Sequence, residues 1–115
     1  MTIERYEKNP RASRAVVHSG VVHLAGMVAD EANLPVAEQT RQILEQMEQR
    51  LESVGSAKDR LLSVTIYLSD MARFDELNSV WDSWLDRENP PARACVGAAL
   101  ARSGFHVEMT AVAAV

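Results

Sequence analysis

One arginine, Arg93, lies in an otherwise apolar segment that follows two consecutive prolines, in the stretch PPARACV. Pro91 has a fixed φ angle and disfavours helix for the residue before it, so we expect an extended strand after the prolines. Side chains alternate along a strand, which predicts Ala94 and Val96 in the core and Arg93 and Cys95 on an open face. A guanidinium binds both oxygens of a carboxylate through its planar fork. Such an arginine could bind a carboxylate ligand. The segment by itself favours an arginine exposed to solvent on an edge strand, and a structural salt bridge is a further alternative.

A carboxylate, Glu108, is expected in the last strand, on the same face as His106 and Thr110. From the residues alone, an ion pair with a nearby arginine is one role that this carboxylate can have. The register of the final strands is not given by sequence, so Arg93 and Glu108 could face one cleft of a single chain or meet across a subunit boundary.

The elements that position these residues follow from hydrophobic periodicity. In the first half of the chain, the pattern predicts a strand at 3–6, two strands within 13–28 around a turn at Ser19-Gly20, and a helix from Pro35 to Val54. A strand is then expected at 62–69, with Leu62, Val64, Ile66 and Leu68 inward, and it is followed by a helix marked by Phe74, Leu77, Trp81, Trp84 and Leu85. Two last strands, at 92–100 and 105–114, are expected to be joined by a turn at 102–104.

The order β-β-β-α-β-α-β-β predicts an α+β fold, with one mixed sheet and both helices on one face. The tryptophans are interpreted as core or subunit-contact residues. Gly26 is expected at a bulge or a point of close backbone approach. The other face of the sheet would be uncovered, and its apolar side chains predict self-association.

Composition narrows the class of protein. The 115 residues are expected to form one domain, 1–115, with 47% apolar and 24% charged residues and a net charge of −4. The acidic balance and lack of long basic tracts argue against nucleic-acid partners. One cysteine allows no internal disulfide and suits a reducing compartment, and neither a signal peptide nor a membrane-spanning run is recognised, so a cytoplasmic location is expected. The three histidines lie far apart, and no phosphate-binding loop is present, so no metal and no cofactor are implied.

Four stretches resemble, in order, the Rid (YjgF) family of small imine and enamine deaminases. They are VVHLAGMVAD, EQTRQILEQMEQRLESVG, LLSVTIYLSDMARFDELNSVWDSWL and PPARACVGAALARSGFHVEMTAVAAV. The likeness covers nearly all 115 residues. It is strongest to the short YoaB-like branch, which shares Arg11, Ser13 and the ending VAAV.

The resemblance implies a chorismate-mutase-like fold and a homotrimer with a barrel-like core and a site in each cleft between subunits. It implies hydrolysis of 2-imino or 2-enamino acids, such as 2-iminopropionate derived from 2-aminoacrylate, to a 2-keto acid and ammonia without a cofactor. In this chain Arg93 would bind the substrate carboxylate and Glu108 would position water. The backbone of Cys95 would touch the substrate nitrogen, Gly26 would allow close approach, and Asn78 would lie near the cleft.

Two departures from the family pattern bear on substrate preference. Many members have a tyrosine before the second strand, where this chain has Arg11-Ala12-Ser13-Arg14, and a serine where it has Ala25. They leave open a non-catalytic binder or sensor of small metabolites that uses the same cleft. An RNA-cleaving activity is a third alternative, which the acidic composition makes the weakest.

Overall fold

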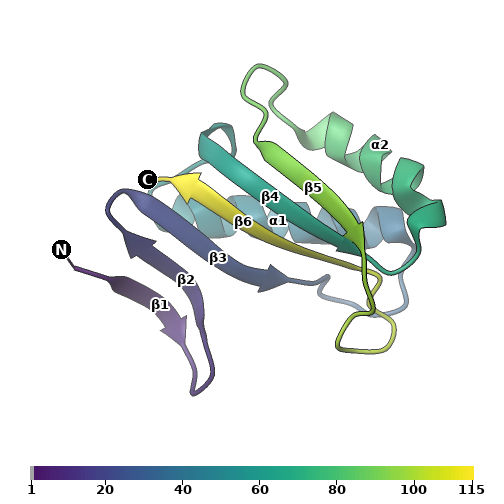
Figure 1. Cartoon of the computed structure of the whole chain (residues 1–115), viewed down its shortest axis with the longest axis horizontal. Helices are drawn as coiled ribbons and strands as arrows, with labels where there is room; N and C mark the ends of the chain where they lie inside the picture. The colour runs from purple at the N-terminus through teal and green to yellow at the C-terminus, as the bar shows by residue number, and fades with distance from the viewer. Residues whose placement is uncertain (1) are drawn as a thin grey trace.

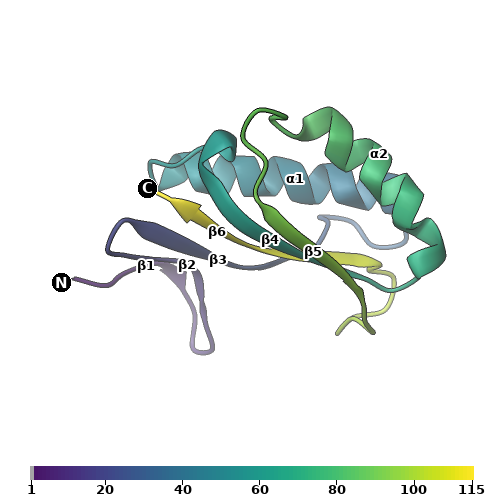
Figure 2. The same ribbon diagram turned by 45° about the horizontal axis from the view of Figure 1, so that its top comes forward.

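The chain forms one six-stranded mixed sheet with two helices on one of its faces (Figures 1 and 2), in a computed structural model that describes residues 2–115. The strands are β1 (Glu4–Lys8), β2 (Ser13–His18), β3 (Val21–Met27), β4 (Leu61–Leu68), β5 (Ala92–Gly97) and β6 (Val107–Ala114). The helices are α1 (Val36–Ser53) and α2 (Phe74–Trp84), and short 3₁₀ turns η1 (Lys58–Arg60) and η2 (Met71–Arg73) precede β4 and α2. The predicted order and class of the fold are confirmed.

The last strand is inserted into the middle of the sheet. The strand order is β1-β2-β3-β6-β4-β5, in which β4 and β5 are parallel and the other neighbours are antiparallel. The prediction that the final two strands form a hairpin is therefore wrong, because β4 lies between them. Gly104 has the positive φ of a turn residue, +85°, but that turn belongs to a longer connection that passes the end of β4 (Figure 1).

The core lies between the helices and the sheet. The residues of α1 that repeat at helical spacing form a buried apolar stripe, which includes Ile43, Met47 and Leu51. This stripe packs against the alternate residues of β6 that face the helices, among them Met109 and Ala111. One inward residue of β4 differs from the prediction: Leu61 is 6% exposed, whereas Leu62 is 48% exposed. The pairing of β4 with β6 shifts in register between Leu61 and Ser63, which reverses the alternation at this end of the strand.

No helix covers the second face of the sheet in the part of the chain that the structure describes (Figure 2). Its central strands present half-buried side chains of mixed polarity, with Tyr67 opposite Glu108 and Thr65 opposite Thr110. This open face is more polar than the sequence suggested. None of the helices formed by residues 2–115 has the length and hydropathy to span a membrane.

A buried glutamine, which the hydrophobic periodicity did not identify, connects the loop before α1 with the loop before β6. Gln39 is fully buried in α1, where its amide donates to the carbonyl oxygens of Leu34 and Gly104 at 2.9 and 3.0 Å. Its side-chain oxygen accepts from the backbone N–H of His106 at 2.8 Å. Buried polar groups of this kind are costly to leave unpaired, so Gln39 stabilises the connection between β5 and β6.

We expect Gln39→Leu to lower the free energy of unfolding by about 2–4 kcal/mol while the side chain keeps its volume. The carbonyl of Leu34 and the N–H of His106 lose their bonds to Gln39, and the carbonyl of Gly104 keeps only its bond from the N–H of Asn33. Urea unfolding followed by circular dichroism measures this change. Gln49→Leu, on the exposed side of the same helix, is the matched control and should change stability by less than about 0.5 kcal/mol. Equal effects of the two substitutions would contradict the role of Gln39.

Candidate active site

Arg93 lies on the face of β5 that is turned toward the helices. In the parallel register it is the partner of Val64, and Cys95 is the partner of Ile66; both partners are buried beneath the helices. The prediction that Arg93 and Cys95 point away from the core face is therefore wrong, and Val96, which is 43% exposed, lies on the open face. The small residues of β5 alternate only weakly between apolar and polar side chains. The pairing of β5 with β4 therefore decides which side chains face the helices.

Helix α2 holds the guanidinium of Arg93. Its central carbon lies 5.2 Å from the ring centre of Trp81 and 5.9 Å from that of Phe74, and Nη1 donates to the side-chain oxygen of Asn78 at 2.8 Å. No carboxylate of residues 2–115 forms an ion pair with Arg93. A guanidinium has five N–H donors, and this one is exposed. It is consequently oriented by aromatic rings and one amide, with donors available to a carboxylate ligand.

Cys95 does not have the environment of a nucleophile. Its side chain is partly buried and packs against the core. Burial raises the pKa of the Cys95 thiol, and the neighbouring positive charge of Arg93 only partly opposes this. A protonated thiol is a poor nucleophile. The β5 backbone, by contrast, forms one edge of the sheet, where alternate peptide groups point outward without a strand partner.

Glu108 lies on the open face, next to the backbone of Gly26. The bulge expected at Gly26 is present, since the pairing of β3 with β6 shifts between Leu24 and Met27. A Cβ atom on Gly26 would come within 2.4 Å of Oε2 of Glu108, so only glycine leaves room for the carboxylate in this position. The carboxylate faces a small cavity of about 180 Å³ whose walls also include Val28, Arg102 and Phe105.

The five predicted site residues form two groups on opposite faces of the sheet. Arg93, Cys95 and Asn78 lie on the helix side of the β5 edge, whereas Gly26 and Glu108 lie on the open face. Strand β4 separates β5 from β6. The two groups of one chain therefore cannot contact the same small molecule, and a site that uses both requires two copies of the chain.

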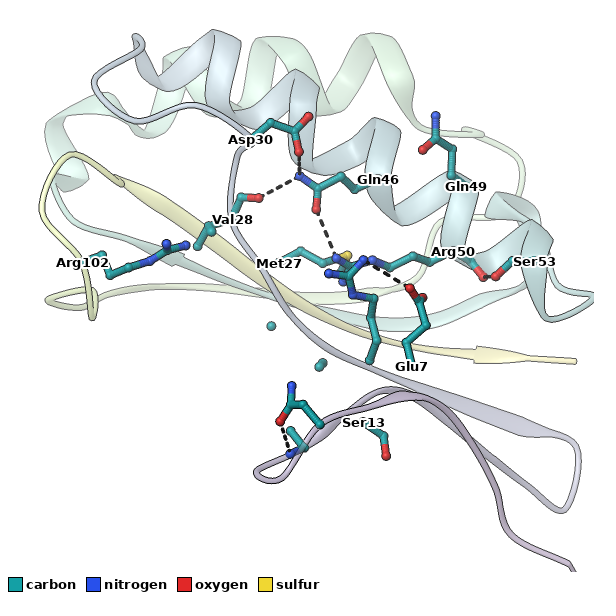
Figure 3. A pocket seen from close by; sticks show the side chains of 15 residues that line it. Glu7, Ser13, Met27, Val28, Asp30, Gln46, Gln49, Arg50, Ser53 and Arg102 are labelled. Carbon is teal, nitrogen blue, oxygen red and sulfur yellow. Dashed lines mark hydrogen bonds and ion pairs between the residues drawn. The ribbon is translucent and has the colours of Figure 1, made fainter.

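A second, larger cavity was not identified from the sequence. It has a volume of about 780 Å³ and lies between the β1–β2 turn, the end of β3 and α1 (Figure 3). Arg14, Arg50 and Arg102 line it, and it shares Arg102, Gly26 and Val28 with the cavity at Glu108. The only sequence signal was the set of arginines itself, because residues from four separate segments make up the walls.

The described residues include no group of three or more histidine, cysteine, aspartate or glutamate side chains arranged to hold a metal ion. His106 instead makes a local contact, 3.1 Å between its Nδ1 and the hydroxyl of Ser69. The chemistry that the arrangement itself offers is carboxylate binding at Arg93 and proton transfer at Glu108.

Comparison with known proteins agrees with this architecture. The family model described as endoribonuclease L-PSP matches residues 2–115. RutC family protein YoaB of Escherichia coli is 36% identical over 115 residues, covering 100% of both chains, and a RutC family protein of Haemophilus influenzae is 36% identical over 116 residues, covering 98% of both. The crystal structure of a YjgF-family protein from Neisseria meningitidis superposes with a TM-score of 0.95 at 41% identity, over 99% of this chain and 95% of that one. The chain belongs to the YjgF (Rid) family, whose sequence model carries the description endoribonuclease L-PSP.

Proposed function

We propose that this protein hydrolyses reactive 2-imino and 2-enamino acids to 2-keto acids and ammonia, in a site formed between two copies of the chain. The observation that carries the proposal is the placement of Arg93 and Glu108. An oriented arginine with available donors and a carboxylate beside a glycine backbone are the two groups the reaction needs, and they lie on opposite faces of the sheet.

In the proposed reaction, Arg93 of one copy binds the substrate carboxylate through two N–H groups. Glu108 of the other copy accepts a proton from water as the water oxygen adds to the imine carbon. The imine nitrogen takes that proton, which gives a neutral amino alcohol. The amino alcohol collapses when the proton of its new hydroxyl group passes through Glu108 to the nitrogen, the C–N bond breaks, the hydroxyl oxygen becomes the keto oxygen, and ammonia and the keto acid leave. An enamine enters the same sequence after it tautomerises to the imine, in which its carbon gains a proton and its nitrogen loses one. Outward peptide groups near Cys95 at the β5 edge contact the substrate nitrogen.

The proposed assembly is a homotrimer that pairs the β5 edge of one copy with the open face of the next. Such a contact brings Arg93 of one copy toward Glu108 of its neighbour and covers the uncovered face of the sheet. Sedimentation velocity should therefore show a species of three times the 12.7 kDa chain. A monomer at micromolar concentration would exclude the two-copy site.

The direct test supplies purified protein with 2-iminopropionate generated from alanine by an amino-acid oxidase. We expect faster release of pyruvate and ammonia than in buffer alone. Binding of 2-keto acids without any acceleration would favour a small-metabolite binder instead. An RNA-cleaving activity, which the description of the family model names, has less support because the chain carries a net charge of −4.

Gly26 provides a test of the carboxylate position. We expect Gly26→Ala to lower kcat for imine hydrolysis by about 10²-fold, because the added methyl group displaces the Glu108 carboxylate from its place over the β3 backbone. Stability should change by less than about 1 kcal/mol, since the clash is with the flexible end of a side chain. Turnover and thermal unfolding of the same preparation separate the two effects. Full activity in Gly26→Ala would show that the observed position of Glu108 is not needed.

A further inference from the structure

Three arginines from three separate segments line the larger cavity. Arg14 comes from β2, Arg50 from α1 and Arg102 from the connection between β5 and β6. Figure 3 shows Arg50 and Arg102 extending toward the cavity from opposite sides. The guanidinium of Arg102 forms a cation–π contact with Phe105, with 4.6 Å between its central carbon and the ring centre. The charges of Arg14 and Arg50 repel each other, and repulsion between like charges is unfavourable unless an anion offsets it. The cluster formed by these two residues and Arg102, which lines the same cavity, is therefore a candidate anion site.

Arg50 is the least satisfied of the three. Its Nη1 atom is buried and has no hydrogen-bond partner among the described residues, and Nη2 donates only a long bond, 3.4 Å, to Gln46. Desolvation by burial lowers the pKa of Arg50, and the charge of Arg14 lowers it further, against smaller opposing effects of Glu7 and Asp30. A buried guanidinium nitrogen without an acceptor is costly, and a bound carboxylate near this group would offset part of that cost.

The two carboxylates in the cavity wall do not neutralise the cluster. Glu7 is 3.6 Å from Arg14, but both side chains are more than half exposed, so a ligand can replace this weak pair. The carboxylate of Asp30 accepts a hydrogen bond of 2.9 Å from the side-chain amide of Gln46, so one of its oxygens is bound to Gln46 and not to an arginine. Three guanidinium groups thus face two carboxylates that are weakly held or otherwise engaged.

The cluster is next to the proposed reaction centre. Gly26, Val28 and Arg102 line both this cavity and the small cavity at Glu108. A substrate whose imine carbon lies at Glu108 therefore has the cavity that the arginines line as its neighbouring space. The segment before and at the start of β2 contributes Ala12, Ser13 and Arg14 to the cavity wall, and none of these side chains is aromatic.

We propose that the cluster of Arg14, Arg50 and Arg102 binds the side-chain carboxylate of dicarboxylic 2-imino acids, the imines that correspond to aspartate and glutamate. This inference rests on the proposed function and specifies its substrate class. Arg93 of a second copy holds the carboxylate next to the imine carbon, and the cluster holds the distal one. Water addition and loss of ammonia proceed as for the monocarboxylic substrate.

The test compares kcat/KM for imines generated in situ from glutamate, aspartate and alanine by the corresponding amino-acid oxidases. We expect the wild type to prefer at least one acidic imine to 2-iminopropionate by about tenfold or more, the size of one charge-assisted hydrogen bond. Arg50→Gln and Arg102→Gln should each reduce that ratio by about tenfold. Arg87→Gln, which removes an exposed arginine outside the cavity, should leave the ratio unchanged.

Calorimetric binding of 2-oxoglutarate and 2-oxobutanoate provides a readout that needs no turnover. We expect tighter binding of the dicarboxylate, and loss of this difference in Arg50→Gln and Arg102→Gln but not in Arg87→Gln. Hydrolysis of 2-iminopropionate with no preference for acidic imines, and equal binding of the two keto acids, would overturn the inference and leave the proposed function intact. Arginine-dependent dicarboxylate binding without hydrolysis of any imine would support the anion site and remove the deaminase function.

Discussion

Arg93→Ala is expected to lower kcat/KM for imine hydrolysis by about 10²–10⁴-fold, because two charge-assisted hydrogen bonds to the substrate carboxylate are lost. Arg93 is exposed and has no ion pair among the described residues, so the fold and the assembly should persist. The substitution removes the contacts of Arg93 with Trp81, Phe74 and Asn78, all of which lie on α2. Steady-state kinetics and sedimentation of the same sample measure both properties.

Arg93→Lys tests whether the site needs the two-pronged guanidinium group or only a positive charge. An ammonium group keeps the positive charge but cannot bind both carboxylate oxygens in one plane or stack on the rings of α2 in the same way. We therefore expect Arg93→Lys to remain far below the wild type. Arg87→Ala serves as the exposed control. A folded Arg93→Ala protein with full activity would remove Arg93 from the site.

Glu108→Gln is expected to keep ligand binding and to lower kcat by about 10²–10⁴-fold, the usual contribution of a general acid or base. The amide preserves the shape of the side chain over Gly26 but cannot take the proton of the attacking water. Titration with 2-oxobutanoate, followed by the hydrolysis assay, separates binding from turnover. Equal turnover in wild type and variant would exclude Glu108 as the base.

A structural role for Glu108 makes a different prediction. If the carboxylate only stabilised β6, Glu108→Gln would lower the unfolding temperature together with activity. Glu108 forms no ion pair with a described residue, so the salt-bridge alternative raised by the sequence has no partner within residues 2–115. An exposed carboxylate elsewhere, Glu52, gives the control substitution Glu52→Gln, which should change neither property.

The sequence by itself determined the elements and their order, because these depend on local and periodic properties. The stripe of α1 repeats at helical spacing. Residue types that commonly end or begin helices also stand at the ends of the elements: Gly55, with a positive φ of +83°, follows α1, and Asp70 caps the turn before α2 by accepting from the N–H of Ala72. Gly26 was likewise recognisable, since a glycine within a strand pattern indicates a bulge or a close approach. Family resemblance, rather than periodicity, selected Arg93 and Glu108.

Tertiary structure alone decided how these residues are combined. Insertion of β6 between β3 and β4 depends on pairing between strands distant in sequence, so it could not be predicted from the turn at 102–104. The side to which Arg93 points is set by its pairing with Val64, because the small residues around it have no clear hydrophobic alternation. The same packing places Arg93 and Glu108 on opposite faces of the sheet. It also brings Arg14, Arg50 and Arg102 to the wall of one cavity. The physical reason is that periodicity reports which side of an element is apolar, whereas only strand pairing and packing bring distant residues together.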